Sequence, residues 1–382
     1  MDRVMVIYGT RPEAIKLAPL IARLAASEHL QPLPVVTGQH REMLDQVNQL
    51  FGIEPVHDLD IITPRQTLTD VTVRALSGLS DVIRAEAPVA VVVQGDTTTS
   101  FVAALAAFYA QVPVAHVEAG LRTSDPYNPF PEEINRRLTS QLASLHLAPT
   151  RTSRANLVAE NVKPSRIFVT GNTVIDALHS VVARRLAYSD LALERLDGRS
   201  VLITAHRRES WGAPMAASAR AIATLARRYP DVTFVLPAHL NPVVREVLLP
   251  PLAGLPNVAI TEPLPYGQFC RLMQDSHLIL TDSGGVQEEG PSLGKPVLVM
   301  RETTERPEAV EAGTVRLVGT DEATIVREVA ALLDDADHYA TMANAVNPYG
   351  DGHAARRSVQ AIEHFFGLAD PPDDFDPAYS GR

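Results

Sequence analysis

The chain has 382 residues, of which 46% are hydrophobic, and a formal net charge of −11. This length exceeds that of one typical domain, so we expect two domains with sizeable hydrophobic cores. The acidic balance argues against general nucleic-acid binding, because such binding needs an excess of cations to neutralise phosphates.

The sequence also restricts which cofactors and which cellular location we expect. Cys270 is the only cysteine, which excludes an internal disulfide framework and a cysteine-based zinc cage. The spacing of histidines and acids contains no HExxH or similar pattern, so we predict no metal. The N-terminus lacks the regions of a signal peptide, and no apolar run approaches the roughly 18 residues of a membrane span. We therefore expect a soluble, cytoplasmic protein without a membrane partner.

Short β-branched runs alternate with amphipathic helical stretches, which is typical of parallel sheets with helices on both faces. In the first half the predicted strands are residues 4–8, 33–37, 89–93, 112–117, 145–148 and 167–170. In the second half they are residues 201–204, 233–236, 258–261, 278–281, 297–300 and 315–318. Helices are expected between them, for example at 12–27 and 99–111, and the tail after Asp370 should be frayed.

The pattern predicts an α/β fold of two doubly wound, Rossmann-like domains that join around residues 171–176. Ligands of such sheets bind at the carboxyl ends of the strands, so we expect the site in a cleft between the domains.

The first loop, GTRPEAIK at residues 9–16, is not GxGxxG, which disfavours a dinucleotide cofactor. Arg11 and Lys16 beside a helix start suit a pyrophosphate, or could support nearby acids. An ordinary capping loop whose lysine reaches solvent explains them equally well.

Acidic residues follow two later strands. Asp96 lies in QGDTTT and Glu118 in HVEAGLR, and a carboxylate after a buried strand needs a partner or a function. Glu132 and Arg136 are four residues apart and share a helix face. Singly, Asp96 could be a helix cap and Glu132–Arg136 a surface ion pair. Together they suit acid–base catalysis better than structure alone.

The second half offers ligand-binding candidates. His206 follows a strand and could move a proton or contact a phosphate, although most loop histidines do neither. Phe269 could stack on a base or pack in the core. The pair Gly284-Gly285 leaves backbone N–H groups open at a helix start, which suits phosphate. An ordinary βα turn has the same sequence, but the charged loop at residues 301–308 could close on this site.

Together the motifs closely resemble those of the bacterial non-hydrolysing UDP-N-acetylglucosamine 2-epimerases, in order from residue 9 to about residue 352. They are GTRPEAIK, QHREMLDQV, GDTTT, HVEAGLR, PEEINR, TGNTVIDA, HRRES, HLNP, TDSGGVQEE, GKPVLVMRETTERPEA and NPYGDG. The resemblance implies a glycosyltransferase-B-like fold. Its first domain would be residues 1–172, joined by the C-terminal helix at about 363–382, and its UDP-binding domain residues 173–362.

The implied activity is interconversion of UDP-GlcNAc and UDP-ManNAc. The C2 proton is removed and UDP eliminated to give 2-acetamidoglucal, and both are re-added with the other configuration. The resemblance further implies no cofactor, a homodimer, and supply of ManNAc for surface polysaccharide. Rival interpretations are a UDP-sugar glycosyltransferase of the same fold, a hydrolysing epimerase, and a nucleotide-sugar-binding regulator without turnover.

The resemblance also assigns site residues. The catalytic group is Asp96, Glu118, Glu132, Arg136 and His206. The UDP group is Arg11, Lys16, Phe269 (uracil), Ser283, Gly284 and Gly285 (phosphates), Glu289 (ribose) and Arg306 (diphosphate). A second, activating UDP-GlcNAc would contact Gln39, Arg65, Arg207 and His239. The sequence departs from the family pattern at Glu42 (glutamine in a related enzyme), Gln94 (often histidine) and Gly290 (often alanine).

Overall fold

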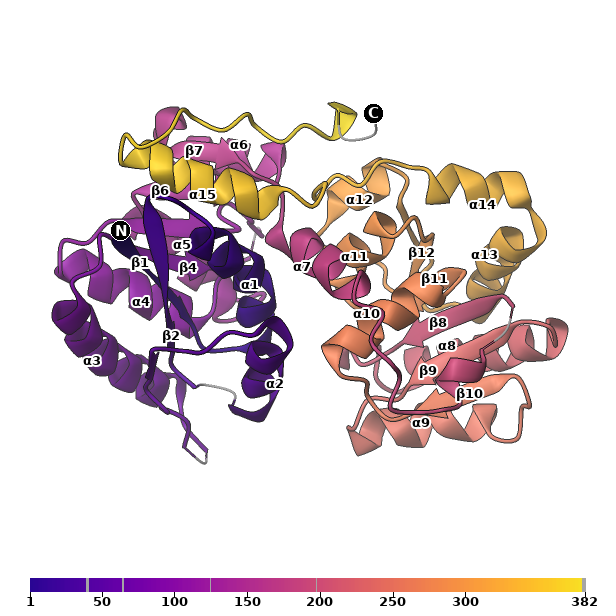
Figure 1. Cartoon of the computed structure of the whole chain (residues 1–382). Coiled ribbons are helices and arrows are strands. Elements are labelled where there is room, and N and C mark those ends of the chain that lie inside the picture. Colours follow the sequence, from indigo (N-terminus) through magenta and orange to yellow (C-terminus); the bar gives the residue numbers. More distant parts are fainter. Residues whose placement is uncertain (39–40, 64, 124, 197, 380–382) are drawn as a thin grey trace. The chain divides into compact units, whose positions relative to one another are not determined.

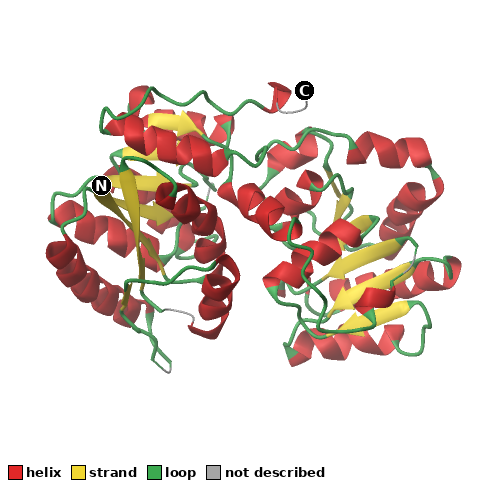
Figure 2. Cartoon of the chain, viewed as in Figure 1, coloured by secondary structure: helices red, strands yellow, loops and turns green. Residues whose placement is uncertain are grey.

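The computed structural model describes residues 1–38, 41–63, 65–123, 125–196 and 198–379. Contacts divide the chain into two units: Met1–Ala177 with Tyr349–Asp376, and a second unit whose body is Leu178–Pro348. Each unit is built on a parallel sheet that carries helices on both faces (Figures 1 and 2). The predicted α/β class with two Rossmann-like halves is confirmed.

In the described part of the first unit the sheet has seven strands in the order β3-β2-β1-β4-β5-β6-β7. They are β1 (Asp2–Tyr8), β2 (Leu30–Val36), β3 (His57–Asp58), β4 (Ala90–Gln94), β5 (Val114–Val117), β6 (Leu145–Ala148) and β7 (Ile167–Val169). All predicted strands of this half are present. The sequence missed β3, because two polar, partly exposed residues give no apolar pattern.

Helices cover both faces of this sheet, whose central strands are continuous apolar runs because they are buried on both sides. The helices are α1 (Arg11–Ala25), α2 (Arg41–Phe51), α3 (Leu68–Glu86), α4 (Thr98–Tyr109), α5 (Glu132–Leu142), α6 (Arg151–Ala159) and α15 (Ala354–Phe365), with the 3₁₀ turn η1 (Pro164–Arg166). Helix α7 (Thr173–Val182) carries the chain into the second unit.

The described residues of the second unit form a six-stranded sheet in the order β10-β9-β8-β11-β12-β13. The strands, all predicted, are β8 (Ser200–Thr204), β9 (Thr233–Pro237), β10 (Val258–Thr261), β11 (Leu278–Thr281), β12 (Val297–Val299) and β13 (Val315–Leu317). The helices are α8 (Ala213–Arg228), α9 (Pro242–Leu252), α10 (Tyr266–Asp275), α11 (Val286–Ser292), α12 (Pro307–Glu311), α13 (Glu322–Asp334) and α14 (Ala336–Ala343). Short 3₁₀ turns are η2 (Leu193–Arg195), η3 (Arg208–Ser210) and η4 (Pro377–Tyr379).

The chain returns to the first unit before α15. Asp176 accepts the N–H groups of Ala354 at 3.1 Å and Ala355 at 2.9 Å, at the start of that helix. The N–H of Asn172 donates to the carbonyl of Tyr349 at 2.6 Å. The whole of α15 therefore belongs to the first unit, whereas the sequence places the return at about residue 363.

The expectation of a frayed tail after Asp370 is wrong. Phe375 is 1% exposed, and its N–H donates to the carbonyl of Val169 at 2.6 Å. The N–H of Val169 donates to Asp374 at 2.8 Å, and Asp374 and Asp376 form ion pairs with α6. The tail covers β7, the edge strand of the sheet. Local composition cannot reveal this, because every partner is about 200 residues away in the chain.

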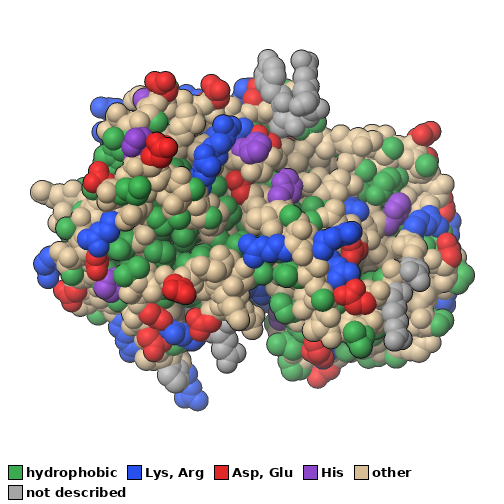
Figure 3. Space-filling model, in the orientation of Figure 1, with side chains coloured by type: hydrophobic (Ala, Val, Ile, Leu, Met, Phe, Trp, Pro, Cys, Tyr) green, Lys and Arg blue, Asp and Glu red, His purple; other side chains and the backbone are tan. Residues whose placement is uncertain are grey.

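Among the described residues, no helix combines the length and apolar character that a membrane crossing requires. Acidic and basic side chains are interspersed over the face of the molecule shown in Figure 3.

Candidate active site

Polar turns follow β1, β4 and β5, which are neighbours in the first sheet, so these turns lie at one edge of it. The turn after β1 begins at Gly9, where close packing requires a glycine. A Cβ there would lie 2.2 Å from Oγ1 of Thr37 and 2.6 Å from Oγ1 of Thr99. The turn after β1 therefore packs closely against the segments that follow β2 and β4.

Glu118 follows β5 directly and is 7% exposed, in a left-handed conformation with φ of 62°. Such a conformation is strained for a residue with a side chain. The ammonium of Lys16 lies 2.5 Å from Oε2 of Glu118, and the amide of Gln94 donates to the same oxygen. Both described donors therefore contact the same carboxylate oxygen, Oε2.

Asp96 is joined to α5 by Arg136. The Nε of Arg136 donates to Oδ2 of Asp96 at 3.1 Å, and Nη2 contacts the same oxygen. Nη1 of Arg136 donates to Glu133, a fully buried acid, at 3.1 Å. Glu132 lies one turn before Arg136 and is half-buried, and no described side chain forms a hydrogen bond or ion pair with its carboxylate. The structure thus brings Asp96 and Arg136 together, with Glu132 on the same helix.

Glu13 is a buried residue that the sequence analysis missed. Its Oε2 accepts the N–H groups of Gly9 at 3.0 Å and Thr10 at 2.8 Å. Its Oε1 accepts the hydroxyls of Thr97 at 2.7 Å and Ser100 at 2.8 Å. Glu13 therefore ties the start of α1 to the start of α4. The capping-box spacing, Thr10 to Glu13, was the signal that could have revealed it.

Two buried histidines lie beneath the acidic turns. His116 on β5 pairs with His146 on β6. Burial lowers the pKa of His116 to about 4 and that of His146 to about 3, so both are neutral at pH 7. Nε2 of His116 is 2.7 Å from the carbonyl of Gly95, and only a protonated nitrogen can donate to a carbonyl. His116 therefore fixes the turn that presents Asp96.

In the second unit, Asp282 organises the loop after β8. This acid is 1% exposed, and its Oδ2 accepts the N–H groups of His206 at 2.6 Å and Arg207 at 2.7 Å. Its Oδ1 is 2.9 Å from Nδ1 of His206. Burial alone would raise the pKa of Asp282, but His206 and the two N–H groups outweigh burial and lower it. Asp282 therefore orients the ring of His206 through Nδ1, a contact that the sequence did not predict.

His239 stacks on His206, with ring centroids 5.8 Å apart. Its Nδ1 accepts the N–H of Asn241 at 3.1 Å, so neutral His239 carries its proton on Nε2. Burial, followed by the neighbouring His206, lowers the pKa of His239. These contacts bring two predicted residues, His206 and His239, side by side.

The glycine turn after β11 is overlaid by two arginines. A Cβ on Gly284 would lie 2.9 Å from Nη1 of Arg306 and 3.2 Å from Nη2 of Arg207. Gly284 has an ordinary negative φ, so the glycine is needed for space and not for conformation. Gly285 is exposed at the start of α11, and Ser283 is partly exposed.

The remaining residues predicted for UDP lie on elements next to these turns. Glu289 on α11 is 6% exposed and accepts the hydroxyl of Tyr266 at 2.9 Å. Phe269 is partly buried one turn later on α10. Arg11 begins α1 in the first unit and is also partly buried.

Of the residues predicted for an activator, Gln39 lies outside the described residues. Arg65 is exposed between β3 and α3, with φ of 58°. The departure Gly290 has a packing reason, because a Cβ there would lie 2.6 Å from Val297 and 3.0 Å from Ile279. Among the described residues, no group of three or more His, Cys, Asp or Glu could hold a metal ion.

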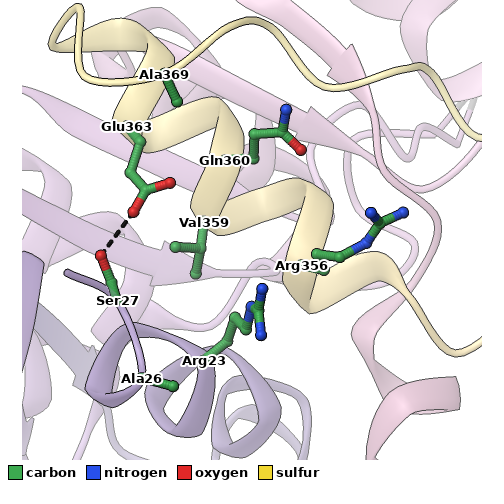
Figure 4. A pocket seen from close by; sticks show the side chains of 8 residues that line it. All are labelled: Arg23, Ala26, Ser27, Arg356, Val359, Gln360, Glu363 and Ala369. Atoms are coloured by element: carbon green, nitrogen blue, oxygen red, sulfur yellow. Dashed lines mark hydrogen bonds between the residues drawn. The ribbon is translucent and has the colours of Figure 1, made fainter. Parts of the chain in front are cut away.

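A pocket of about 280 Å³ in the first unit lies between the last turn of α1 and α15 (Figure 4). Arg23, Arg356 and Gln360 line it, and Ser27 donates to Glu363 at 2.6 Å. Because α1 starts at the carboxyl edge of the sheet, its last turn is at the opposite edge. This pocket is therefore separate from the acidic turns.

The two Rossmann-like units define an α/β enzyme of the glycosyltransferase-B-like class. The sequence profile of the UDP-N-acetylglucosamine 2-epimerase family matches residues 22–363. The chain belongs to the UDP-N-acetylglucosamine 2-epimerase family, whose members are isomerases, which confirms the resemblance seen in the sequence.

Individual relatives agree with this family assignment. The UDP-N-acetylglucosamine 2-epimerase of Escherichia coli K12 is 52% identical over 370 residues, covering 95% of this chain and 98% of that protein. A crystal structure of a putative UDP-N-acetylglucosamine 2-epimerase from Listeria monocytogenes has a TM-score of 0.93 and 47% identity, covering 98% of this chain and 99% of that one. The UDP-GlcNAc 2-epimerase of Neisseria meningitidis, solved with bound UDP-GlcNAc, has a TM-score of 0.86 and 47% identity, covering 95% and 100%.

The buried histidines should make the protein sensitive to acid. An unfolded histidine has a pKa of about 6.5, above the folded values of about 4 and about 3 for His116 and His146. Between pH 6.5 and 4 the unfolded chain therefore binds protons that the folded chain does not. We predict that stability falls as pH drops through this window, by up to about 1.4 kcal/mol per pH unit per histidine.

Denaturant unfolding of the wild type and His146→Asn between pH 4.5 and 7 checks this prediction. The variant should show a smaller loss of stability on acidification, while the same change at the exposed His29 should leave the pH dependence as it was. Equal pH dependence in wild type and His146→Asn would contradict it.

Proposed function

We propose that the protein interconverts UDP-GlcNAc and UDP-ManNAc by eliminating and re-adding UDP. A base takes the C2 proton, the electron pair of the C–H bond forms a C1–C2 double bond, and the C1–O bond breaks with its electrons on UDP. UDP then returns to C1 while C2 receives a proton on the opposite face. Support comes from relatives solved with UDP-GlcNAc, and with UDP-GlcNAc and UDP together, from Neisseria meningitidis and Methanocaldococcus jannaschii.

The chemistry explains why both acids and cations are needed. A sugar C–H far from a carbonyl is a weak acid, so departure of UDP must supply much of the driving force. Cations and backbone N–H groups stabilise the leaving diphosphate, and carboxylates move the proton. No net oxidation occurs, so the reaction needs neither a nicotinamide nor another redox cofactor.

The observation that carries the proposal is the pair of acids at the ends of β4 and β5. Lys16 and Gln94 both contact Oε2 of Glu118. Asp96 is held by Arg136. A buried carboxylate is costly in a purely structural role, and ionisable groups in such surroundings are common at catalytic sites. We assign proton transfer to Asp96, Glu118 and Glu132, with Arg136 and His206 in support.

For UDP we propose a phosphate-binding turn in the second unit and, separately, two basic residues in the first unit. The N–H groups of Ser283, Gly284 and Gly285 and the Arg306 guanidinium suit the diphosphate. Glu289 suits the ribose hydroxyls and Phe269 the uracil. Arg11 and Lys16 add positive charge from α1.

Incubating the protein with UDP-GlcNAc in D₂O, without NAD or metal, tests the proposal. We expect deuterium at C2 and a mixture of the two UDP-sugars by NMR, because the abstracted proton exchanges with solvent. No C2 exchange under conditions where UDP-GlcNAc binds would overturn the epimerase mechanism.

The same spectra separate the rival functions. Release of free ManNAc and UDP would indicate a hydrolysing epimerase. Sugar transfer to an acceptor with the C2 proton retained would indicate a glycosyltransferase, and binding without any turnover would indicate a regulator.

A second UDP-GlcNAc is proposed as an activator that contacts Gln39, Arg65, Arg207 and His239. The support is that Arg207 and His239 both adjoin His206, so a ligand on them can influence a catalytic residue. UDP-ManNAc alone should then turn over with a lag that a trace of UDP-GlcNAc abolishes. Identical progress curves with and without the trace would argue against this site.

A homodimer is also proposed, with a second copy covering exposed apolar side chains on α3 and α4. These helices pack together and expose Val73 by 60%, Phe108 by 56% and Tyr109 by 67%. A solution mass equal to one chain would contradict the dimer.

We also propose that the product supplies ManNAc for surface polysaccharide. An unchanged ManNAc content of the surface polysaccharide in a strain that lacks the protein would contradict this.

A further inference from the structure

Three arginines of the second unit gather around the glycine turn after β11. Arg306 and Arg207 both pass over the backbone of Gly284, close enough that a Cβ on Gly284 would contact both guanidinium groups. Arg301, at the end of β12, is 8% exposed and belongs to the same group. Three like charges in so small a volume repel one another unless an anion lies between them.

Glu305 is the acid that contacts all three. Its Oε2 is 2.8 Å from Nη1 of Arg301 and 3.9 Å from Nη1 of Arg306. Its Oε1 is 3.7 Å from Nη2 of Arg207. Burial alone would raise the pKa of Glu305, but its hydrogen bond with Arg301 and the charges of Arg301 and Arg306 outweigh burial and lower it to about 2. The carboxylate is therefore ionised at neutral pH.

The other two arginines have additional acidic partners. Nε of Arg306 donates to Glu288 at 2.5 Å, and Nε of Arg301 donates to Glu209 at 2.6 Å. Arg207 differs, because Glu305 is the one carboxylate within 4 Å of its guanidinium in the described part of the chain. Loss of the Glu305 charge would therefore leave Arg207 without a counter-ion.

We propose that Glu305 is a resident counter-ion that positions Arg207 and Arg306 at the glycine turn and is displaced from them by the diphosphate of UDP. The inference rests on the proposed function, because it takes Ser283–Gly285 and Arg306 as the diphosphate site. A diphosphate carries more charge than one carboxylate and offers more acceptor oxygens. It competes successfully for the guanidinium groups, while Arg301 retains Glu305 at 2.8 Å.

Displacement has a consequence for affinity. Each UDP that binds must break the contacts of Glu305 with Arg207 and Arg306, so Glu305 weakens binding while keeping the arginines in place. The same contacts re-form when UDP leaves. Glu305 thus favours release of a ligand that several cations would otherwise hold tightly. Because one carboxylate contacts both Arg207 and Arg306, a ligand on either arginine changes the charge that the other experiences.

The test is to measure binding of UDP, UMP and uridine to the whole protein by calorimetry, in wild type and Glu305→Gln. The substitution keeps the size of the side chain and removes its charge. We expect UDP to bind about threefold or more tightly in the variant, on the scale of a partly exposed ion pair. The gain should shrink for UMP, vanish for uridine, and decrease in high salt.

Two variants control the measurement. Glu302→Gln makes the same change on the same loop, at an exposed acid with no arginine partner within 4 Å among the described residues, and should leave UDP affinity unchanged. Glu305→Asp keeps the charge and should bind UDP nearly as the wild type does. If Glu305→Gln does not fold, Glu305→Ser is measured with the same expectation.

The outcomes are distinct. Unchanged or weaker UDP binding in a folded Glu305→Gln or Glu305→Ser protein would overturn the role of Glu305. An equal gain for uridine and UDP would overturn it too, because uridine has no phosphate to compete. Failure of the wild type to bind UDP at all would instead overturn the proposed function.

Discussion

The ion pair between Lys16 and Glu118 is the interaction on which the first unit's site depends. A buried carboxylate in a strained conformation needs a cation or a hydrogen-bond donor to be tolerated. Lys16 can supply that cation only because α1 begins where it does. Glu13 fixes the start of α1 through the N–H groups of Gly9 and Thr10. A chain of contacts therefore connects the loop at Gly9 to the carboxylate of Glu118.

The acids near the candidate site fall into two kinds that their hydrogen bonds distinguish. Glu13, Glu133 and Asp282 are almost fully buried, and each accepts several donors that order neighbouring turns. Their role is structural. Asp96 and Glu118, by contrast, are each held from one side, which is the state expected of a group that must exchange a proton. Glu305 resembles the second kind, but its partners are the arginines proposed to bind phosphate.

Most of the fold, and the residue types of the candidate site, could be predicted from the sequence. Buried parallel strands are apolar along their whole length, so the twelve predicted strands were found and confirmed, while β3, with two polar residues, was not. Motifs at strand ends singled out Asp96, Glu118 and His206 as candidates by residue type. The partners that hold them, such as Gln94 for Glu118 and Asp282 for His206, are defined by contacts between distant segments. No local pattern encodes those contacts, and the docked tail at Phe375 was missed for the same reason.

We propose above all that carboxylates of the first unit transfer the C2 proton and that the glycine turn after β11 in the second unit binds UDP. The most direct measurement compares UDP affinity and the rate of C2 deuterium exchange in Asp96→Asn, Glu118→Gln, Glu132→Gln and the exposed control Asp81→Asn. The account predicts near-normal UDP affinity in all four and exchange reduced by about 10²- to 10⁴-fold in the first three alone. Near-normal exchange in all three carboxylate variants would contradict it.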